Sequence, residues 1–482
     1  EELVLLFVGK GTEFILDRRT VARTDAADGS VEERRLVESG AKDIVNFSRG
    51  IDQKAGTFTN ETGGKINITG GKGFYVTGGT VENSGIIDVN SVTGLQLKGS
   101  SVKFENKNLI KVSSKEENGK IIGGIGVVVS EKRSDGTATF DNQGRIEVEF
   151  GAKGIQVGKG IAENNGTIIS EGTSATGVYI NGDGIPKVDS NGKPLKDENG
   201  KIIMSGKYEN PEFINNNQIV VKGKEAKAIY FGANGGTANN AGTIEVTSGG
   251  IGAYFGGNGT FTNKKGSNII VSGKVVEQVF KEDGTPDLDE NGKQKEKTTI
   301  SKGIFLNSKG TATNEGNILV GYKVDDTGNI VLGEEGAVGV QVNNLDAQFI
   351  NNKGSNIEVA GGSQGIQVNK GTAINEGNIL TEGTNAVGIY MNAASKKDEN
   401  GNILYEKSEF TNKNQIVASG TGAKGIQFGA GGGTVTNTGD ITAENGAIGV
   451  FFYQGTNNIL INSGTINAGE NGSAIESGKD TN

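Results

Sequence analysis

Few side chains in this sequence are suited to catalysis. Its 482 residues include no His and no Cys, so the commonest general base and the thiolate nucleophile are both missing. Carboxylates remain, and two of them held at a fixed separation can hydrolyse a glycosidic bond. Asp88 and Glu147, each of which follows an Ile, illustrate such a pair. Because 57 acidic residues make coincidences of this kind common, we interpret both as solvated surface and predict no catalytic residue.

A second candidate is a calcium loop. The segment 287–292, Asp-Leu-Asp-Glu-Asn-Gly, matches the opening of an EF-hand loop. Such a loop ends on a bidentate Glu, where this sequence has Thr298, and its seventh and ninth positions are here Lys293 and Lys295. We therefore predict a hairpin turn at this segment, with no metal site and no cofactor.

Aromatic and amide side chains suggest binding. They occupy the third position of a recurring four-residue motif that starts with Gly or Ala, such as Gly-Ile-Gln-Val from Gly154. If the second and fourth residues of a strand face inward, the third faces outward. Along the chain this position reads Tyr75, Gln96, Gly126, Gln156, Tyr179, Tyr230, Tyr254, Phe305, Gln341, Gln367, Tyr390, Gln427 and Phe451.

The aromatic members of this row are the candidate binding residues. An exposed aromatic stripe can mark a contact surface for a protein or a glycan. Alternatively, the rings only stack on one another and stabilise the sheet, as cross-strand pairs do. The candidates are Tyr179, Tyr230, Tyr254, Phe305, Tyr390 and Phe451.

A repeat must position these residues. Its marker is an Asn-x-Gly or Asn-x-Asn corner, spaced by 22 to 25 residues where no insertion intervenes. A fixed period of this length is typical of a solenoid. Asn suits a corner because it tolerates positive φ and bonds its own backbone, and stacked amides can form a ladder. The corners are Asn60, Asn83, Asn106, Asn142, Asn164, Asn215, Asn240, Asn263, Asn314, Asn351, Asn375, Asn412, Asn437 and Asn462.

Each copy of the repeat contains three short β runs. They are the four-residue motif, an apolar position such as Phe58 before the Asn, and paired Ile or Val residues such as Ile87 and Val89 after it. One copy cannot bury its own apolar face, but copies stacked at the strand spacing of ~4.8 Å cover one another. We predict an all-β protein, a right-handed parallel β-helix of about 14 coils, the number of corners.

The solenoid is expected over residues 51–477, and the ends differ from it. Residues 1–50 lack the pattern and are predicted to form an N-terminal cap, or alternatively a piece of a separate domain. Residues 478–482 follow a partial coil and suggest a truncated end. Insertions with Asn-Gly signals predict projecting hairpins, which are further binding candidates. They lie near 113–137, 182–209, 273–300, 321–335 and 393–408.

The charge and hydropathy of the sequence restrict the kinds of partner that the chain is expected to bind. The net charge is −9, with no basic run of the kind that nucleic acids or membrane surfaces attract. No stretch of ~20 apolar residues appears, so we expect a segment that is not embedded in a membrane. We expect a monomeric rod that has no nucleic-acid partner.

At this point the sequence resembles a known family. Repeats of the form F-T-N-x-G-x-I-x-V and G-I-Q-V, rich in Lys and Asn, are similar to passenger domains of large type V autotransporter adhesins, in the RadD-like fusobacterial style. The resemblance covers roughly residues 51–477. It implies a virulence-associated rod on the outer membrane of a Gram-negative cell, adhering to host-cell protein or glycan or to other bacteria. The signal peptide and translocator barrel of that family match no part of this chain.

Two alternatives remain beside an adhesin. The chain could be a passive stalk that presents a binding domain lying outside it. It could also be a polysaccharide-degrading β-helix enzyme, which predicts a cleft with clustered Asp, Lys or Arg.

Overall fold

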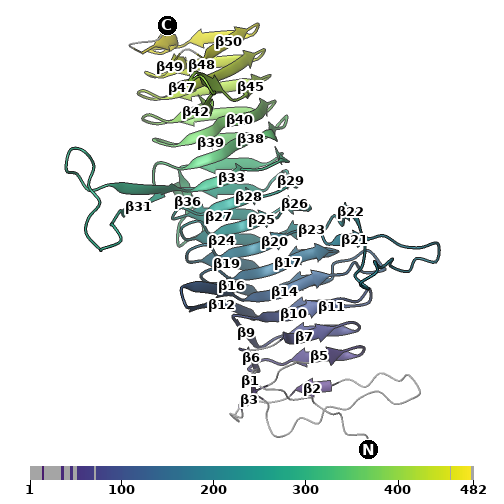
Figure 1. Cartoon of the computed structure of the whole chain (residues 1–482). Helices are drawn as coiled ribbons and strands as arrows, with labels where there is room; N and C mark the ends of the chain where they lie inside the picture. The colour runs from purple at the N-terminus through teal and green to yellow at the C-terminus, as the bar shows by residue number, and fades with distance from the viewer. Residues whose placement is uncertain are drawn as a thin grey trace, which may run out of the picture.

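The protein is a parallel β-helix. The computed structural model describes residues 13–15, 34–36, 44–46, 52–69, 72–455 and 457–478, and every regular element in these ranges is a β-strand. Strands of successive coils pair in parallel and build a long rod (Figure 1). The predicted fold is therefore confirmed.

Each coil contributes a strand to three rows. The quartet row carries the four-residue motif, and its strands pair along the rod. It consists of β4 (Asp52–Gln53), β7 (Lys72–Val76), β10 (Thr93–Leu97), β14 (Ile125–Ser130), β17 (Lys153–Lys159), β20 (Thr176–Ile180), β25 (Lys227–Phe231), β28 (Ile251–Phe255), β33 (Lys302–Leu306), the first parts of β38 (Val338–Asn351), β40 (Gln364–Asn375) and β47 (Lys424–Asn437), β42 (Val387–Asn392), β49 (Ile448–Phe452) and β52 (Ser473–Ser477).

The asparagine row follows it, and from β5 onward its strands end on the corner Asn of each coil. It consists of β2 (Arg34–Leu36), β5 (Thr57–Asn60), β8 (Thr80–Asn83), β11 (Lys103–Asn106), β15 (Phe140–Asn142), β18 (Ile161–Asn164), β23 (Glu212–Asn215), β26 (Thr237–Asn240), β29 (Thr260–Asn263), β34 (Gly310–Asn314), the second parts of β38, β40 and β47, β45 (Ser408–Asn412) and β50 (Asn458–Asn462).

The third row forms a separate sheet of stacked parallel strands. Within the described ranges this row has fourteen members, in agreement with the predicted number of coils. They are β6 (Lys65–Ile68), β9 (Ile86–Asn90), β12 (Leu109–Glu117), β16 (Arg145–Val148), β19 (Thr167–Glu171), β24 (Gln218–Lys222), β27 (Thr243–Thr247), β30 (Asn268–Val271), β35 (Asn317–Val320), β39 (Asn356–Val359), β41 (Asn378–Glu382), β46 (Gln415–Ser419), β48 (Asp440–Glu444) and β51 (Thr465–Ala468).

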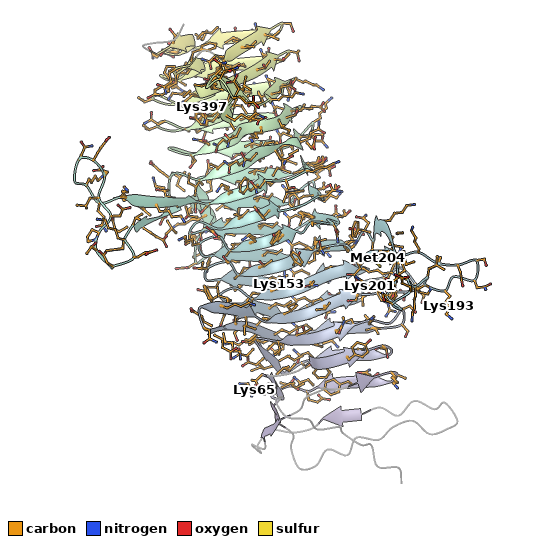
Figure 2. The ribbon with its side chains drawn as sticks, in the orientation of Figure 1. Lys65, Lys153, Lys193, Lys201, Met204 and Lys397 are labelled. Carbon is orange, nitrogen blue, oxygen red and sulfur yellow. The ribbon has the colours of Figure 1, made fainter. Side chains whose placement is uncertain are left out.

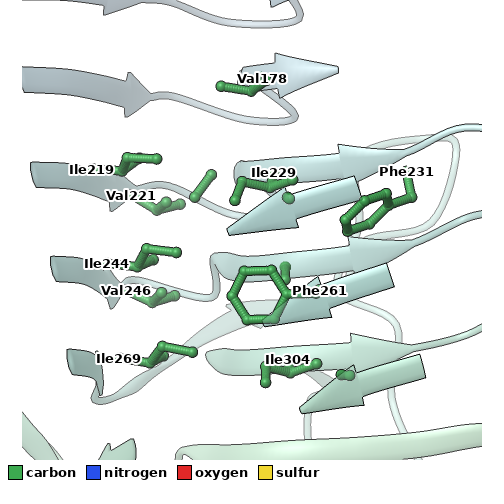
Figure 3. Close-up of a cluster of buried hydrophobic side chains, with 14 of the residues drawn as sticks. Val178, Ile219, Val221, Ile229, Phe231, Ile244, Val246, Phe261, Ile269 and Ile304 are labelled. Atoms are coloured by element: carbon green, nitrogen blue, oxygen red, sulfur yellow. The ribbon is translucent and has the colours of Figure 1, made fainter. Parts of the chain in front are cut away.

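The core runs along the inside of the rod. All three rows send apolar side chains inward, for example Ile229 and Phe231 from β25, Ile244 from β27 and Phe261 from β29 (Figure 3). Each is fully buried, and burial of such a side chain stabilises the fold by roughly 1.5–3 kcal/mol. No coil achieves this burial without its neighbours.

Large and small side chains alternate along the middle of the asparagine row. Phe213 pairs in register with Ala238, and Ala238 pairs with Phe261. The alternation continues through Ala312 and Phe349. Because successive coils are only ~4.8 Å apart, an Ala between two Phe residues leaves room for the rings.

The leading Gly of the four-residue motif is required by the same close spacing. A Cβ atom added to Gly154 would lie 2.6 Å from the carbonyl oxygen of Gly177 in the next coil. This contact corrects one motif assignment. The sequence pattern predicts a motif that starts at Gly124 and has Gly126 at its outward third position. In the structure Gly126 is the residue equivalent to Gly154. The motif therefore starts at Gly126, and Val128 occupies the outward third position.

The corner asparagines form a continuous hydrogen-bonded ladder. The Nδ2 of each Asn donates to the Oδ1 of the next, over 2.7–2.8 Å, from Asn60 to Asn462. Several Nδ2 groups also donate to a carbonyl of their own turn, as Asn164 does to Gly166. The expectation of positive φ is wrong, because every ladder Asn ends a strand in extended backbone. Among the non-Gly residues that the structure describes, positive φ occurs mainly between the third row and the quartet row, for example at Ser174 and Asn385.

Most of the insertions form antiparallel hairpins, but residues 131–139, where 113–137 was predicted to project a hairpin, form a loop without a strand. The two longest project from opposite sides of the rod: β21 (Gly184–Pro186) with β22 (Met204–Tyr208), and β31 (Lys274–Gln278) with β32 (Glu296–Ile300) (Figure 1). Three shorter hairpins are made by β12 with β13 (Lys120–Gly123), by β36 (Tyr322–Val324) with β37 (Ile330–Leu332), and by β43 (Ser395–Lys397) with β44 (Ile403–Tyr405).

One hairpin does not project as expected. The strand β36 packs against β27 and β30 of the third row, and the backbone N–H of Val324 donates to Glu245 Oε1 over 3.4 Å. The outward residues Glu245, Ile270 and Leu319 are buried in this region. The insertion at 321–335 is therefore a cover on the outside of the rod.

Most of the predicted cap lies outside the described residues. Within 1–50 the structure describes β1 (Glu13–Ile15), β2 and β3 (Ile44–Asn46); β1 pairs antiparallel with β3, and β2 pairs in parallel with β5. The end predicted for 478–482 is described only at Gly478.

Candidate binding face

Four of the six candidate aromatic residues form one continuous row. Tyr179, Tyr230, Tyr254 and Phe305 are register partners on four consecutive coils. Their ring centroids are 5.1, 5.1 and 5.5 Å apart, and successive planes are turned by 79°, 72° and 57°. We call these four residues the aromatic ladder. All are half-buried on the outside of the rod.

Glycine residues in the next coil make room for the tyrosines. A Cβ atom added to Gly232 would lie 2.5 Å from the hydroxyl oxygen of Tyr179, and one added to Gly256 would lie 2.5 Å from Cε2 of Tyr230. At the next step, Asn307 takes the equivalent place, and its Nδ2 donates to the Tyr254 hydroxyl over 3.2 Å. The residue after each four-residue motif thus sets the environment of the preceding ring.

A row of lysines lies beside the aromatic ladder. Lys153, Lys227 and Lys302 each precede a four-residue motif. The Lys153 Nζ lies 4.1 Å from the ring centroid of Tyr179, and the Lys302 Nζ lies 5.1 Å from that of Phe305. Lys227 lies between two rings, 5.8 Å from Tyr230 and 5.5 Å from Tyr254. These distances permit cation–π attraction.

These lysines were not predicted as site residues, although the sequence contains a signal for them. A Lys immediately before the motif recurs in Lys-Gly-Ile-Gln, Lys-Ala-Ile-Tyr and Lys-Gly-Ile-Phe. Strict alternation places that Lys and the third motif residue on opposite faces. In the structure the first two motif residues are both buried, so the alternation breaks and both flanking side chains face outward.

Burial governs the electrostatics of this row. It lowers the pKa of Lys153, Lys227 and Lys302, and the nearby Glu225 carboxylate partly offsets the effect at the latter two. Among the described residues none of the three forms an ion pair with a carboxylate. The ammonium groups therefore lie over aromatic rings without a neutralising partner. Burial also raises the pKa of Tyr179.

The two long insertions border the aromatic ladder. The segment 182–209 leaves from the end of β20, which carries Tyr179, and 273–300 leads into β33, which carries Phe305 (Figure 1). We call the outer surface of β17, β20, β25, β28 and β33 the binding face. Figure 2 shows Lys153 on one of these strands, and Lys193, Lys201 and Met204 on the neighbouring insertion.

The two long insertions expose large apolar residues. On 182–209 these are Val188, Leu195, Ile202, Met204 and Tyr208, with 40–52% of each side chain's surface exposed. On 273–300 they are Val276, Phe280 and Leu288, with 46–58% exposed. Exposed apolar groups beside a polar surface are typical of contact sites.

The remaining two aromatic candidates lie apart from the ladder. Tyr390 has Gln367 and Gln427 as its register partners, so no ring continues the row on either side. Phe451 lies near Lys424, whose Nζ is 5.5 Å from its ring centroid, but it is separated from Tyr390 by Gln427. The structure thus brings together four of the six predicted residues.

The calcium-like segment is a turn, as predicted. Asp289 Oδ1 accepts hydrogen bonds from the backbone N–H groups of Asn291 and Lys293, both over 2.9 Å. Asp287 pairs with Lys295 over 3.0 Å. No group of three potential metal-binding side chains occurs in the part of the chain that the structure describes.

The carboxylates Asp88 and Glu147 lie on different coils with Lys111 between them in register. Glu147 lies 3.6 Å from Lys111, and Asp88 lies 3.7 Å from Lys65. Both carboxylates therefore belong to surface ion pairs between coils, in keeping with their interpretation as solvated surface.

Comparison with family models, with curated proteins and with solved structures gives no match for this chain. No helix long and apolar enough to span a membrane occurs among the described residues.

Proposed function

We propose that this chain is an adhesive rod at a bacterial cell surface, an autotransporter passenger that binds a protein or glycan on host cells or on partner bacteria. The observation that carries the proposal is the binding face. There a row of aromatic rings and unpaired lysines lies between two insertions with exposed apolar side chains. Rings, cations and apolar loops on a rigid scaffold are the features that recognition surfaces use.

The rod itself supports the proposal. A parallel β-helix extends by ~4.8 Å per coil, so fourteen coils span roughly 65 Å and can hold a binding face away from a cell surface. The repeats and composition resemble those of autotransporter passengers, as described above.

A passive stalk is the second candidate function. Its support is the contact of the ladder rings with one another, which stabilises the stack whether or not a ligand binds. For a stalk, the outer rings are needed only for stability.

Cell binding separates the two functions. The purified chain is incubated with epithelial cells and with a co-colonising bacterium, and bound protein is measured against concentration. We expect saturable binding that falls at least about tenfold in affinity in the Tyr179→Ser/Tyr230→Ser variant. Tyr390→Ser, outside the ladder, is the matched control and should bind as the unchanged chain does.

Folding is verified by β-sheet circular dichroism for every variant. Absence of saturable binding by the folded, unchanged chain contradicts the adhesive proposal and leaves the stalk. Equal binding by the double variant and the control shows that the ladder is not the contact surface.

A further inference from the structure

We propose that the binding face takes a linear anionic glycan, with Lys153, Lys227 and Lys302 contacting its carboxylate or sulfate groups and the aromatic ladder contacting its sugar rings. The inference rests on the proposed adhesive function and names the chemical class of the ligand.

The lysines are spaced regularly along the rod. Lys153 is in register with Thr176, which is in register with Lys227; Lys227 is in turn in register with Ile251, and Ile251 with Lys302. A lysine therefore occurs on every second coil, at intervals of ~9.6 Å along the stack. A linear polysaccharide that is charged on every disaccharide repeats its anionic groups at a comparable interval.

The three lysines combine contact with an aromatic ring and the absence of a carboxylate partner among the described residues. Elsewhere, Lys111 pairs with Glu147 over 3.6 Å, and Lys413 pairs with Glu376 over 2.9 Å. Lys227 and Lys302 donate to the backbone carbonyls of Glu225 and Ile300, but these contacts leave the charge in place. An ammonium group paired with a carboxylate gains little from a second anion, whereas a half-buried one without such a partner attracts an anion at close range with little screening. The local charge of the face is thus positive although the chain as a whole carries −9.

The rings supply the second half of a sugar site. A pyranose ring has an apolar C–H face and a rim of hydroxyl groups. The aromatic ladder offers apolar ring surface at every coil between Tyr179 and Phe305. The hydroxyls of Tyr179 and Tyr230 make no hydrogen bond within the described part of the chain, and so remain available to sugar hydroxyls.

One carboxylate lies close enough to oppose binding. Glu225 acts electrostatically on both Lys227 and Lys302, although it forms no ion pair with either. Its neutralisation should strengthen the attraction for an anionic ligand. The variant Glu225→Gln is therefore expected to gain affinity for an anionic ligand.

The probe is a size-defined heparin octasaccharide, titrated calorimetrically into the full chain; neutral maltooctaose and poly-glutamate are the comparison ligands. We expect saturable binding of the octasaccharide alone. The variant Lys153→Gln/Lys227→Gln/Lys302→Gln should lose at least about tenfold in affinity. The matched control, Lys111→Gln/Lys264→Gln/Lys413→Gln, makes the same charge change away from the face and should stay within about twofold.

Two further variants sharpen the test. Glu225→Gln should bind the octasaccharide more tightly, and Tyr179→Ser/Tyr230→Ser should bind it more weakly even at high salt, where the charge contribution is screened. If the two triple Lys→Gln variants lose the same affinity for the octasaccharide, the attraction depends on overall charge and not on this face, and the inference is overturned. Binding of poly-glutamate as tightly as the octasaccharide also overturns it, in favour of an acidic protein ligand.

Cell binding before and after removal of glycans separates this inference from the proposed function. If the chain binds cells equally well before and after enzymatic removal of sulfated and sialylated glycans, the glycan inference fails while adhesion stands. If it binds neither the octasaccharide nor cells, both fail. Loss of cell binding on glycan removal is the result that we expect.

Discussion

At the scale of single residues, the hydrogen bonds of the asparagine ladder stabilise the corner of each coil. Along most of the rod each Asn side chain is fully buried. Asn240, for example, accepts a hydrogen bond from Asn215 and donates to Asn263 and to the backbone carbonyl of Gly242 in its own turn. A buried polar group left without a partner costs about 1–3 kcal/mol, so every member of the ladder depends on the next. The ladder therefore favours one register between coils over all others.

Removing one member tests this role. Asn240→Ala removes the acceptor of Asn215 Nδ2 and the donor to Asn263 Oδ1. We expect a loss of about 1–3 kcal/mol in the free energy of unfolding, measured by denaturant unfolding. Asn239→Ala, which removes a neighbouring outward amide bonded to Glu212, is the control and should cost less than about 1 kcal/mol. Equal losses would show that the ladder has no special role.

At the scale of elements, the hairpins have two different relations to the rod. The one at 321–335 covers the third row, whereas residues 187–203 of the insertion 182–209 are almost entirely exposed. A segment without buried side chains contributes little to the stability of the rod.

Excision of that exposed segment should therefore be tolerated. Replacing residues 187–203 by Asn-Gly closes the antiparallel pair of Pro186 and Met204 with a two-residue turn. We expect the free energy of unfolding to change by no more than about 0.5 kcal/mol. A large loss in denaturant unfolding would mean that the insertion supports the coils beneath it.

The covering hairpin should respond to pH through Glu245. Burial raises the pKa of this carboxyl above its ordinary value, and the Val324 N–H and Lys222 partly offset the shift. The folded-state pKa is thus above the unfolded one, so the buried carboxylate costs stability at neutral pH. That cost disappears as the pH falls through the raised pKa and the carboxyl takes up a proton.

Glu245→Gln removes the charge and keeps an oxygen acceptor for Val324. At neutral pH we expect slower amide hydrogen exchange over residues 321–335 in the variant than in the unchanged chain. The difference should vanish at acidic pH, where the carboxyl is protonated in both states. A difference that is independent of pH would contradict a role for the charge.

The repeat period, the coil count and the ladder follow from the sequence because each is a local pattern repeated many times. The choice between Gly124 and Gly126 does not, because both start acceptable β runs and only the carbonyl of Gly154 in the next coil decides. The lysine row was missed for a related reason. These lysine side chains face outward because the first two residues of each motif are both buried. This break in the inward–outward alternation cannot be predicted from the residue types.

At the scale of the whole molecule, the rod aligns side chains that are far apart in the sequence. Lys153 and Lys302 are 149 residues apart, and the stack places them on one face with Lys227 between them. A regular solenoid converts a repeat in the chain into a line of equivalent groups. The binding face is such a line, bordered by the two longest insertions.

Lysine acetylation footprinting on cells tests the central claim most directly, namely that this face makes the contact. The chain is labelled free and while bound to cells, and the labelling of each lysine is measured by mass spectrometry. We predict lower labelling of Lys153, Lys227 and Lys302 in the bound state, with Lys65 and Lys111 unchanged. Equal labelling of all five lysines in the free and bound states would contradict the account.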